Sequence, residues 1–435
     1  MPPQSTVSSR ERLEAVLDRL SARRGDERVF LKLYEEDARK AADASDRRRM
    51  AGFGLGPLDG VIVSIKDIFD VAGETTLAGS LIRRSAPPAE KDAEIVARLR
   101  RAGAVIVGRT NANEFCYTSD GINPHYGTPG NAADASRIPG GSSSGAGVSV
   151  AEGTSEIAIG SDTGGSVRIP AALNGVVGFK PTARRVSLAG VFPLSPSLDS
   201  VGPLARSVAD CAAADAVMAA DGDDGLASRP VEGLRIALPP AEILADTDQE
   251  IAAGFEDALK LLARHGAVLR QCAIEDLLAG MREATGAASI ASVEAAAIHA
   301  DWLRAGTEPV DRRTSRSLRR CLDFPEAAHR EMLARRNALA RAMDSRLAEF
   351  DALVVPTLPI FAPLIADMLA DAKFSSAVAG LLLRNTQIVN QFDLTAVSLP
   401  MPGLSLPAGL TLVGRNGADR DLLALAAGVE ALLAG

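Results

Sequence analysis

The 435-residue sequence predicts a single large α/β domain in which helices cover both faces of a central mixed β-sheet. Two observations predict this fold class. Short β-branched runs alternate with amphipathic stretches along the chain. Hydrophobic residues make up 47% of the chain and charged residues 23%, a balance typical of a soluble globular protein with a large core. The length would also permit two or three domains, but single α/β domains reach this size.

The first segment, residues 1–56, is predicted to be helical. Apolar residues recur at helical spacing in 8–24 and 29–50, with Arg and Glu on the opposite side. The pattern changes at 61–65, a short β-branched run that ends at Lys66. We therefore expect a buried strand whose carboxyl end presents a lysine.

Helix and strand continue to alternate, with a helix expected over 90–102 and a strand over 104–108. A polar segment rich in Gly, Pro, Asn and Ser then runs to about residue 147, longer than a connecting loop usually needs. Such loops tend to be functional. The remaining expected elements are the end of a helix at 148–152, strands at 156–160, 176–179, 353–356 and 410–413, a mostly helical region over 245–350, and a C-terminal helix from about 419.

Glycine is concentrated in one window, since 14 of the 39 glycines lie between positions 121 and 190. Two glycine-serine turns stand out there, at 140–145 and 162–166. Neither is a phosphate cradle, because the Lys-Ser/Thr of a Walker loop and the third glycine of a dinucleotide fingerprint are missing. A glycine pair directly before a serine instead frees the main chain to aim successive N–H groups at one point, as a developing oxyanion requires.

A nucleophilic serine beside such donors needs a base. The four histidines, His125, His265, His299 and His329, are dispersed, and with the four scattered cysteines they form no metal-binding pattern. The cysteines are expected to be unpaired and buried, and no metal is expected. A lysine can act as the base if burial lowers its pKa enough to leave the amine neutral. Lys66, which follows an apolar strand, is the lysine best placed for this.

The ordered motifs around these residues resemble the amidase signature family. The segment 139–145 contains Gly-Gly-Ser-Ser-Ser-Gly, and Ser166 of the segment 162–170 follows Ser142 by 24 positions. The likeness is dense over 57–206. Further similar blocks lie at 65–67, 108–111, 114–115, 123–129, 178–182, 397–400 and 409–414.

The resemblance implies a Ser-Ser-Lys triad that needs no cofactor. Ser166 is expected to be the acyl nucleophile, Ser142 the bridging serine after a cis peptide bond, and Lys66 the base. The backbone N–H groups expected to line the oxyanion hole are those of Thr163, Gly164, Gly165 and Ser166. Asp162 and Arg168 are expected to hold this turn through polar contacts. The resemblance also divides the chain into the N-terminal segment 1–56, a signature core 57–206, a variable helical region 235–350 and a C-terminal part of the core, 351–435.

One departure from the family pattern concerns Ser144, where glycine is common. Three adjacent serines leave the bridging role ambiguous on sequence alone, and the spacing to Ser166 favours Ser142. The expected substrate contacts are Cys116, Tyr117, Thr118, Gly141, Ser143 and Phe192. Arg384 is considered as a carboxylate contact, although a surface position is the preferred interpretation.

The predicted function is hydrolysis of a small carboxamide to a carboxylate and ammonia or an amine. Alternatives are the glutaminase A-type subunit of a tRNA-dependent amidotransferase, for which the chain is rather short, and a biuret- or allophanate-type hydrolase. A non-catalytic binding protein is disfavoured because Lys66, Ser142 and Ser166 are all present. The net charge of −8 argues against nucleic-acid binding. Without a signal-peptide core or a membrane-length apolar run, a cytoplasmic protein is expected, with a homodimer as the default oligomer.

Overall fold

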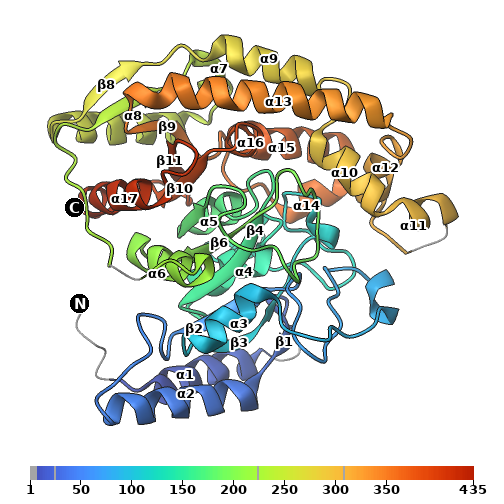
Figure 1. Ribbon diagram of the computed structural model, residues 1–435, viewed down its shortest axis with the longest axis vertical. Coiled ribbons are helices and arrows are strands. Elements are labelled where there is room, and N and C mark those ends of the chain that lie inside the picture. The colour runs from blue at the N-terminus through green and yellow to red at the C-terminus, as the bar shows by residue number, and fades with distance from the viewer. Residues whose placement is uncertain (1–6, 24–25, 223–224, 307–308) are drawn as a thin grey trace.

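The computed structural model describes residues 7–23, 26–222, 225–306 and 309–435. These residues form an 11-stranded sheet in the order β1-β3-β2-β4-β6-β5-β10-β11-β9-β7-β8 (Figure 1). The strands are β1 (Phe30–Leu33), β2 (Ile62–Lys66), β3 (Val105–Thr110), β4 (Ile157–Asp162), β5 (Val177–Lys180), β6 (Ser200–Ala205), β7 (Arg235–Leu238), β8 (Val268–Gln271), β9 (Ala352–Pro356), β10 (Thr395–Pro400) and β11 (Gly409–Gly414). Parallel pairs (β2 with β3 and β4, β7 with β8 and β9) and antiparallel pairs both occur, so the sheet is mixed.

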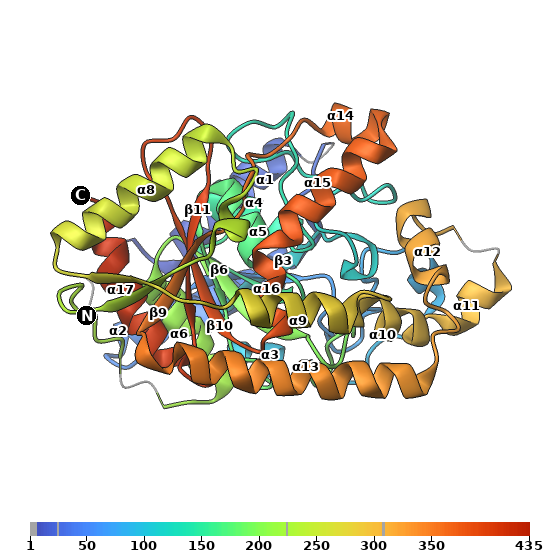
Figure 2. The ribbon, with the colours of Figure 1, turned by 90° about the horizontal axis from the view of Figure 1, so that it is seen from above.

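Helices cover both faces of this sheet. Figure 2 shows α4 and α5 on one face and α3, α6 and α13 on the other. The α-helices are α1 (Ser9–Ala22), α2 (Glu35–Met50), α3 (Glu94–Arg101), α4 (Ser144–Ala151), α5 (Arg168–Asn174), α6 (Val208–Ala219), α7 (Ala241–Leu244), α8 (Gln249–Arg264), α9 (Glu275–Thr285), α10 (Ile290–Ile298), α11 (Ala300–Ala305), α12 (Arg312–Arg319), α13 (Glu326–Arg346), α14 (Ile365–Ala370), α15 (Ala372–Arg384), α16 (Thr386–Gln391) and α17 (Asp419–Leu433), with short 3₁₀ helices η1 (Ile82–Ser85), η2 (Glu114–Cys116) and η3 (Leu347–Glu349). The predicted fold class is confirmed.

The parallel strands β2, β3 and β4 determine where polar groups gather. Every residue of these three strands is buried, which matches their continuous apolar runs. In the register of β2 with β3, Lys66 lies opposite Thr110, and β4 ends at Asp162. Because parallel strands share their direction, the carboxyl ends of all three meet at one edge, where α/β proteins usually bind ligands.

The N-terminal segment is helical, with one correction. Helix α1 begins after Ser8, whose hydroxyl accepts from Glu11 N–H while the Glu11 carboxylate accepts from Ser8 N–H. The helix expected over 29–50 is wrong at its start, because Phe30–Leu33 form β1, an edge strand antiparallel to β3. Pairing with a buried strand outweighs the local helical spacing there. Position 24 of the first expected helix lies outside the described residues.

Besides β1, four strands were not predicted from the local sequence pattern. The central strand β6 contains Gly202 and Pro203, residues that disfavour a strand. Strand β10 begins two residues after the turn at Asp393 and ends at Pro400, a residue that disfavours a strand, and β7 and β8 are four-residue strands in or beside the mostly helical region 235–350. All four are defined by their partners in the sheet rather than by their own periodicity.

The core and the cysteines agree with the composition. The largest apolar cluster includes Val63 and Ile65 of β2, Ile159 of β4 and Leu410 of β11, all 0% exposed. The four cysteines are unpaired and buried, as expected. Among the described residues, no helix combines the length and the apolar character needed to cross a bilayer.

Candidate active site

Lys66, at the carboxyl end of β2, is fully buried and bonded to two hydroxyls. Its amine donates to Ser142 Oγ at 2.8 Å and to Ser161 Oγ at 2.9 Å. Burial lowers the pKa of Lys66, and the neighbouring Cys116 thiol and the carboxylates of Asp162 and Asp199 oppose that shift. The site therefore favours a neutral amine in contact with two serines.

The three adjacent serines differ in their hydrogen-bond partners. Ser142 is the one bonded to Lys66, and the Gly141–Ser142 peptide bond is cis, as expected. The Ser143 hydroxyl donates to the Ser161 carbonyl at 3.3 Å, and Ser144, the first residue of α4, donates to the Asn111 carbonyl at 3.3 Å. Of these three serines, Ser142 is the one whose hydroxyl contacts the lysine.

Ser166 lies in the second glycine-serine turn and is 7% exposed. The Ser143 N–H donates to the Ser166 carbonyl at 3.3 Å, so the two turns face each other. In the part of the chain described, no hydrogen bond joins the Ser142 and Ser166 hydroxyls. The backbone N–H groups of residues 163–166 likewise have no protein acceptor there, whereas Val167 N–H is bonded to Asp162. Four successive donors are thus free for a ligand.

Glycine is required in this turn by close contacts. Gly165 has φ +137°, and a Cβ there would lie 2.3 Å from Thr386 Oγ1. Thr386, the first residue of α16, donates from that hydroxyl to the Gly164 carbonyl at 2.7 Å. At Gly141, a Cβ would lie 2.1 Å from Asn113 Oδ1. Both glycines therefore permit backbone approaches that any side chain would block.

A buried ion pair anchors the base of the same turn. Arg168 donates to both oxygens of Asp162, at 3.0 and 2.9 Å, and both side chains are fully buried. Arg168 also reaches the Thr386 carbonyl and Asn390 Oδ1, at 2.9 and 2.7 Å. Burial raises the pKa of Asp162, but Arg168 outweighs it and holds that pKa at about 2. The pair thus makes the polar contacts within the turn that the sequence led us to expect.

A second carboxylate holds the turn from the other side. Thr163 Oγ1 donates to Asp199 Oδ1 at 2.6 Å, and Asp199 Oδ2 accepts from the N–H groups of Leu194 and Ser195 at 2.9 and 3.0 Å. Burial raises the pKa of Asp199 to about 6, although those hydrogen bonds oppose the shift. Asp199 thus connects the turn to the segment that carries Phe192.

Three of the expected substrate contacts, Cys116, Tyr117 and Thr118, lie on a loop packed against the helical region. Cys116 is buried beside Lys66, and Phe115 and Cys116 both have positive φ. The Tyr117 hydroxyl is bonded at 2.6 Å to Ser292 of α10 and to Ser317 of α12, and Thr118 accepts from Asn113 Nδ2. Arg384 donates to the backbone carbonyls of Ile243 and Ala245, so its guanidinium joins two segments of the protein.

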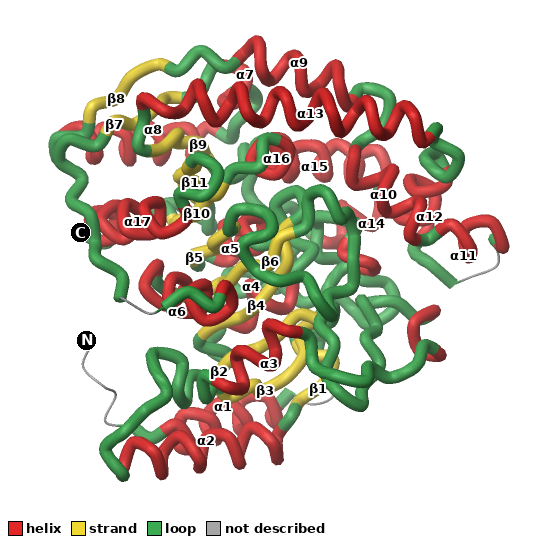
Figure 3. Tube along the Cα trace, in the orientation of Figure 1, coloured by secondary structure: helices red, strands yellow, loops and turns green. Residues whose placement is uncertain are grey.

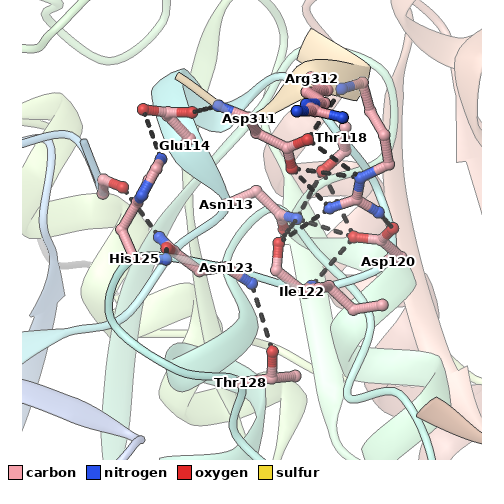
Figure 4. Close-up of polar contacts among 12 residues, drawn as sticks. Asn113, Glu114, Thr118, Asp120, Ile122, Asn123, His125, Thr128, Asp311 and Arg312 are labelled. Carbon is pink, nitrogen blue, oxygen red and sulfur yellow. Dashed lines mark hydrogen bonds and ion pairs between the residues drawn. The ribbon is translucent and has the colours of Figure 1, made fainter. Parts of the chain in front are cut away.

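Figure 4 shows the polar network that holds this loop. Asn113 Nδ2 donates to Asp120 and to the Ile122 carbonyl, and Arg313 of α12 pairs with both Asp120 and Asp311. Glu114 accepts from Asp311 N–H at 2.6 Å, which joins the same loop to the start of α12. Since Ser119 O accepts from Gly141 N–H at 2.8 Å, the network supports the turn that carries Ser142.

The family is established by comparison with known proteins. The Amidase family model matches residues 11–423 of the chain. A 2-amino-5-chloromuconic acid deaminase of Comamonas testosteroni is 37% identical over 411 residues, covering 91% of this chain and 86% of the relative. The chain belongs to the amidase family. It is a hydrolase that acts on C–N bonds.

Other amidase-family relatives differ in the part of the chain that they match. The 1-carboxybiuret hydrolase component AtzE of Pseudomonas sp. (strain ADP) is 46% identical over 216 residues, 49% of this chain and 47% of the relative. The A-type component of the glutamyl-tRNA(Gln) amidotransferase of Symbiobacterium thermophilum is 31% identical over 97% of this chain and 92% of its own. A crystal structure of an amidase superposes with a TM-score of 0.86 at 33% identity, covering 98% and 96% of the two chains.

Three contributors to this amidase site were not expected from the sequence. Ser161, the second partner of Lys66, precedes Asp162 at the end of β4 and differs in no way from an ordinary strand serine. Asp199 and Thr386 come from distant parts of the chain. Ser161 follows the strand expected at 156–160, and no expected element adjoins Asp199 or Thr386, so the local sequence does not select any of the three.

Proposed function

We propose that this amidase hydrolyses a small carboxamide through an acyl-enzyme on Ser166, with Ser142 and Lys66 as the proton relay. The observation that carries the proposal is the fully buried Lys66 amine bonded to Ser142 Oγ, in a turn that faces the one holding Ser166. A neutral amine can accept a proton from Ser142, and a protonated one cannot.

The reaction would begin with attack of Ser166 Oγ on the amide carbon, while its proton passes to Ser142 and the Ser142 proton passes to Lys66. The relay then returns a proton to the nitrogen, the C–N bond breaks, and ammonia or an amine leaves. Water attacks the acyl-enzyme with the same relay as base, which releases the carboxylate and restores Ser166. Each proton taken up by Lys66 is returned within the same half-reaction.

The free N–H groups of Thr163, Gly164, Gly165 and Ser166 would stabilise the oxyanion formed in both half-reactions. One such donor is typically worth about 3–4 kcal/mol in the transition state. Asp162 with Arg168 and Asp199 with Thr163 would keep these donors aligned, because both contacts fix the turn before substrate arrives. No step of this scheme requires a cofactor.

Two narrower activities remain as alternatives within the same chemistry. The likeness to the amidotransferase component supports a glutaminase that works with partner proteins, and the likeness to a carboxybiuret hydrolase supports a urea-derived substrate. The likeness to a 2-amino-5-chloromuconic acid deaminase supports a third alternative, in which the C–N bond attacked is that of an amino-substituted dicarboxylic acid. A cytoplasmic homodimer and the division of the chain into four segments stay predictions.

Ammonia release from aliphatic, aromatic and dicarboxylic amides, glutamine and biuret tests the proposal. Ser166→Ala is expected to abolish release from every substrate that the wild-type protein hydrolyses, and a fluorophosphonate should label the wild-type protein at Ser166. Ser144, whose hydroxyl donates to the Asn111 carbonyl, provides the matched serine control, and Ser144→Ala should still be labelled. Release that persists in Ser166→Ala would contradict the acyl-enzyme.

A further inference from the structure

An aromatic cluster lies directly beside the candidate active site. It is formed by Phe115 of η2, Phe192, His299 at the end of α10 and Trp302 of α11. The ring centroids of Phe115 and His299 are 4.2 Å apart, and those of His299 and Trp302 are 5.4 Å apart. Phe115 precedes Cys116, the neighbour of Lys66, and Phe192 N–H donates to the carbonyl of Ile68, two residues after Lys66. The cluster therefore lies next to the end of β2, the strand that carries Lys66.

Two polar atoms in this cluster are buried without a partner. His299 Nε2 and Trp302 Nε1 form no hydrogen bond within the described residues, and His299 is only 5% exposed. An unpaired buried donor typically costs about 1–3 kcal/mol, so these two atoms need a partner such as a water molecule or a bound ligand. Burial first, and the charge of Arg83 second, lower the pKa of His299 to about 4. The imidazole is thus neutral at neutral pH and can donate one N–H.

Arg83 adds a positive charge to the same place. Its guanidinium lies 5.2 Å from the centroid of the Phe192 ring, and Nε donates to the Thr76 carbonyl at 3.2 Å. Among the described residues, no carboxylate pairs with Arg83, and its two terminal nitrogens have no partner. This contrasts with Arg109 nearby, which is bonded to two carbonyls and lies 3.4 Å from Asp67.

We infer that Arg83, His299 and Trp302 bind a carboxylate carried by the substrate, distal to the C–N bond that is hydrolysed. The cluster offers three kinds of donor to an anion: the Arg83 guanidinium, the indole N–H of Trp302 and one N–H of the neutral His299 imidazole. The inference rests on the proposed function, which places the amide end of the substrate at Ser166. It narrows the substrate class to amides of dicarboxylic acids.

Binding can be measured without turnover, because Trp302 is the only tryptophan of the chain. In Ser166→Ala, half-amides from malonamic to adipamic acid are titrated against primary amides with the same number of carbons. We expect at least one half-amide, and no neutral amide, to change Trp302 fluorescence saturably. The change should be lost in Arg83→Gln combined with Ser166→Ala. It should persist in the matched Arg84→Gln control, since Arg84 contacts Tyr126 instead.

Kinetics with an intact Ser166 provide the second readout. The preferred half-amide should have a kcat/KM about tenfold or more above its neutral counterpart, because a charge-assisted hydrogen bond is lost without the carboxylate. Arg83→Gln should raise KM for the half-amide, preserve kcat and leave neutral amides unaffected. Trp302→Phe, which removes the N–H and keeps a ring, should weaken half-amide binding alone. This second variant keeps the inference testable if Arg83→Gln does not fold.

The outcomes separate this inference from the proposed function. Hydrolysis of neutral amides that depends on Ser166, with no preference for half-amides and no effect of Arg83→Gln, overturns the carboxylate site and leaves the proposed function standing. Selective half-amide binding in Ser166→Ala, with no hydrolysis by the wild-type protein, supports the carboxylate site and contradicts the proposed function. Equal fluorescence changes with neutral amides and half-amides also overturn the inference.

Discussion

At the scale of single residues, the proposed chemistry requires Lys66 to be neutral while it contacts two hydroxyls. Full burial lowers the pKa of the Lys66 amine, and the carboxylates of Asp162 and Asp199 oppose part of that shift. The pKa of Lys66 therefore lies below its ordinary value, and the amine can serve as a base over a wider pH range. Activity should be retained above that pKa and lost as the pH falls through it, because protonation removes the acceptor.

The acid limb of the pH profile of kcat/KM tests whether Lys66 or Asp199 is the group that titrates. Asp199→Asn removes a negative charge that raises the pKa of Lys66, so the limb should move to lower pH if Lys66 is the titrating group. If the limb belonged to Asp199, whose own pKa is about 6, it would disappear in the same variant. Lys66→Met should lower kcat about 10²- to 10⁴-fold, the usual contribution of a general base.

The serines give a second prediction at this scale. Ser142→Ala should lower kcat/KM about 10²- to 10⁴-fold, because in the proposed relay the Ser142 hydroxyl passes the proton of Ser166 to Lys66. Ser144→Ala should cost at most a few-fold, since a single 3.3 Å bond to a carbonyl, worth about 1 kcal/mol, is lost. Equal losses in the two variants would show that the relay does not run through Ser142.

At the scale of elements, the turn between β4 and α5 is shaped by residues distant in sequence. Asp162 begins it and is held by Arg168, Thr163 is held by Asp199, and Gly164 is held by Thr386 of α16. Three separate segments of chain thus fix four successive N–H groups. A turn fixed in this way can stabilise charge without reorganising during the reaction.

A pair of glycine variants tests this rigidity. Gly165→Ala places a Cβ 2.3 Å from Thr386 Oγ1 at a positive φ, so it should destabilise the fold by about 1–3 kcal/mol and lower kcat sharply. Gly164→Ala is the matched control, because its Cβ meets only Leu383 Cδ2, at 3.2 Å. Thermal unfolding and ammonia release measure the two effects. Equal behaviour of the variants would contradict a role for the contact with Thr386.

At the scale of the whole molecule, the helical region between β8 and β9 closes over the carboxyl ends of β2 and β4. Figure 3 shows helices α10 to α12 grouped beside the long loops at this side of the molecule. Bonds from Tyr117 to Ser292 and Ser317, and from Arg313 to Asp120, join the two parts. This helical region is therefore bonded to the loop that carries Tyr117 and Asp120.

Removing Arg313 should loosen this connection. Arg313→Ala leaves the carboxylate of the buried Asp120 without its cation, at a cost of about 1–3 kcal/mol. The midpoint of thermal unfolding should fall, and KM should rise because the loop that carries Cys116 loses support. The neighbouring exposed Arg312→Ala is the control and should leave both quantities unchanged. A KM unaffected by Arg313→Ala would separate the loop from substrate binding.

The sequence by itself determined the family, the α/β class and the order of Lys66, Ser142 and Ser166, because these reside in contiguous motifs and local runs. Strands β1, β6, β7, β8 and β10 were decided by the tertiary structure, since pairing stabilises a strand irrespective of its own pattern. The hydrogen bond from Lys66 to Ser142, and the contacts of Ser161, Asp199 and Thr386, also depend on segments that are distant in sequence. Local sequence cannot encode a hydrogen bond whose two partners meet only after the sheet has formed.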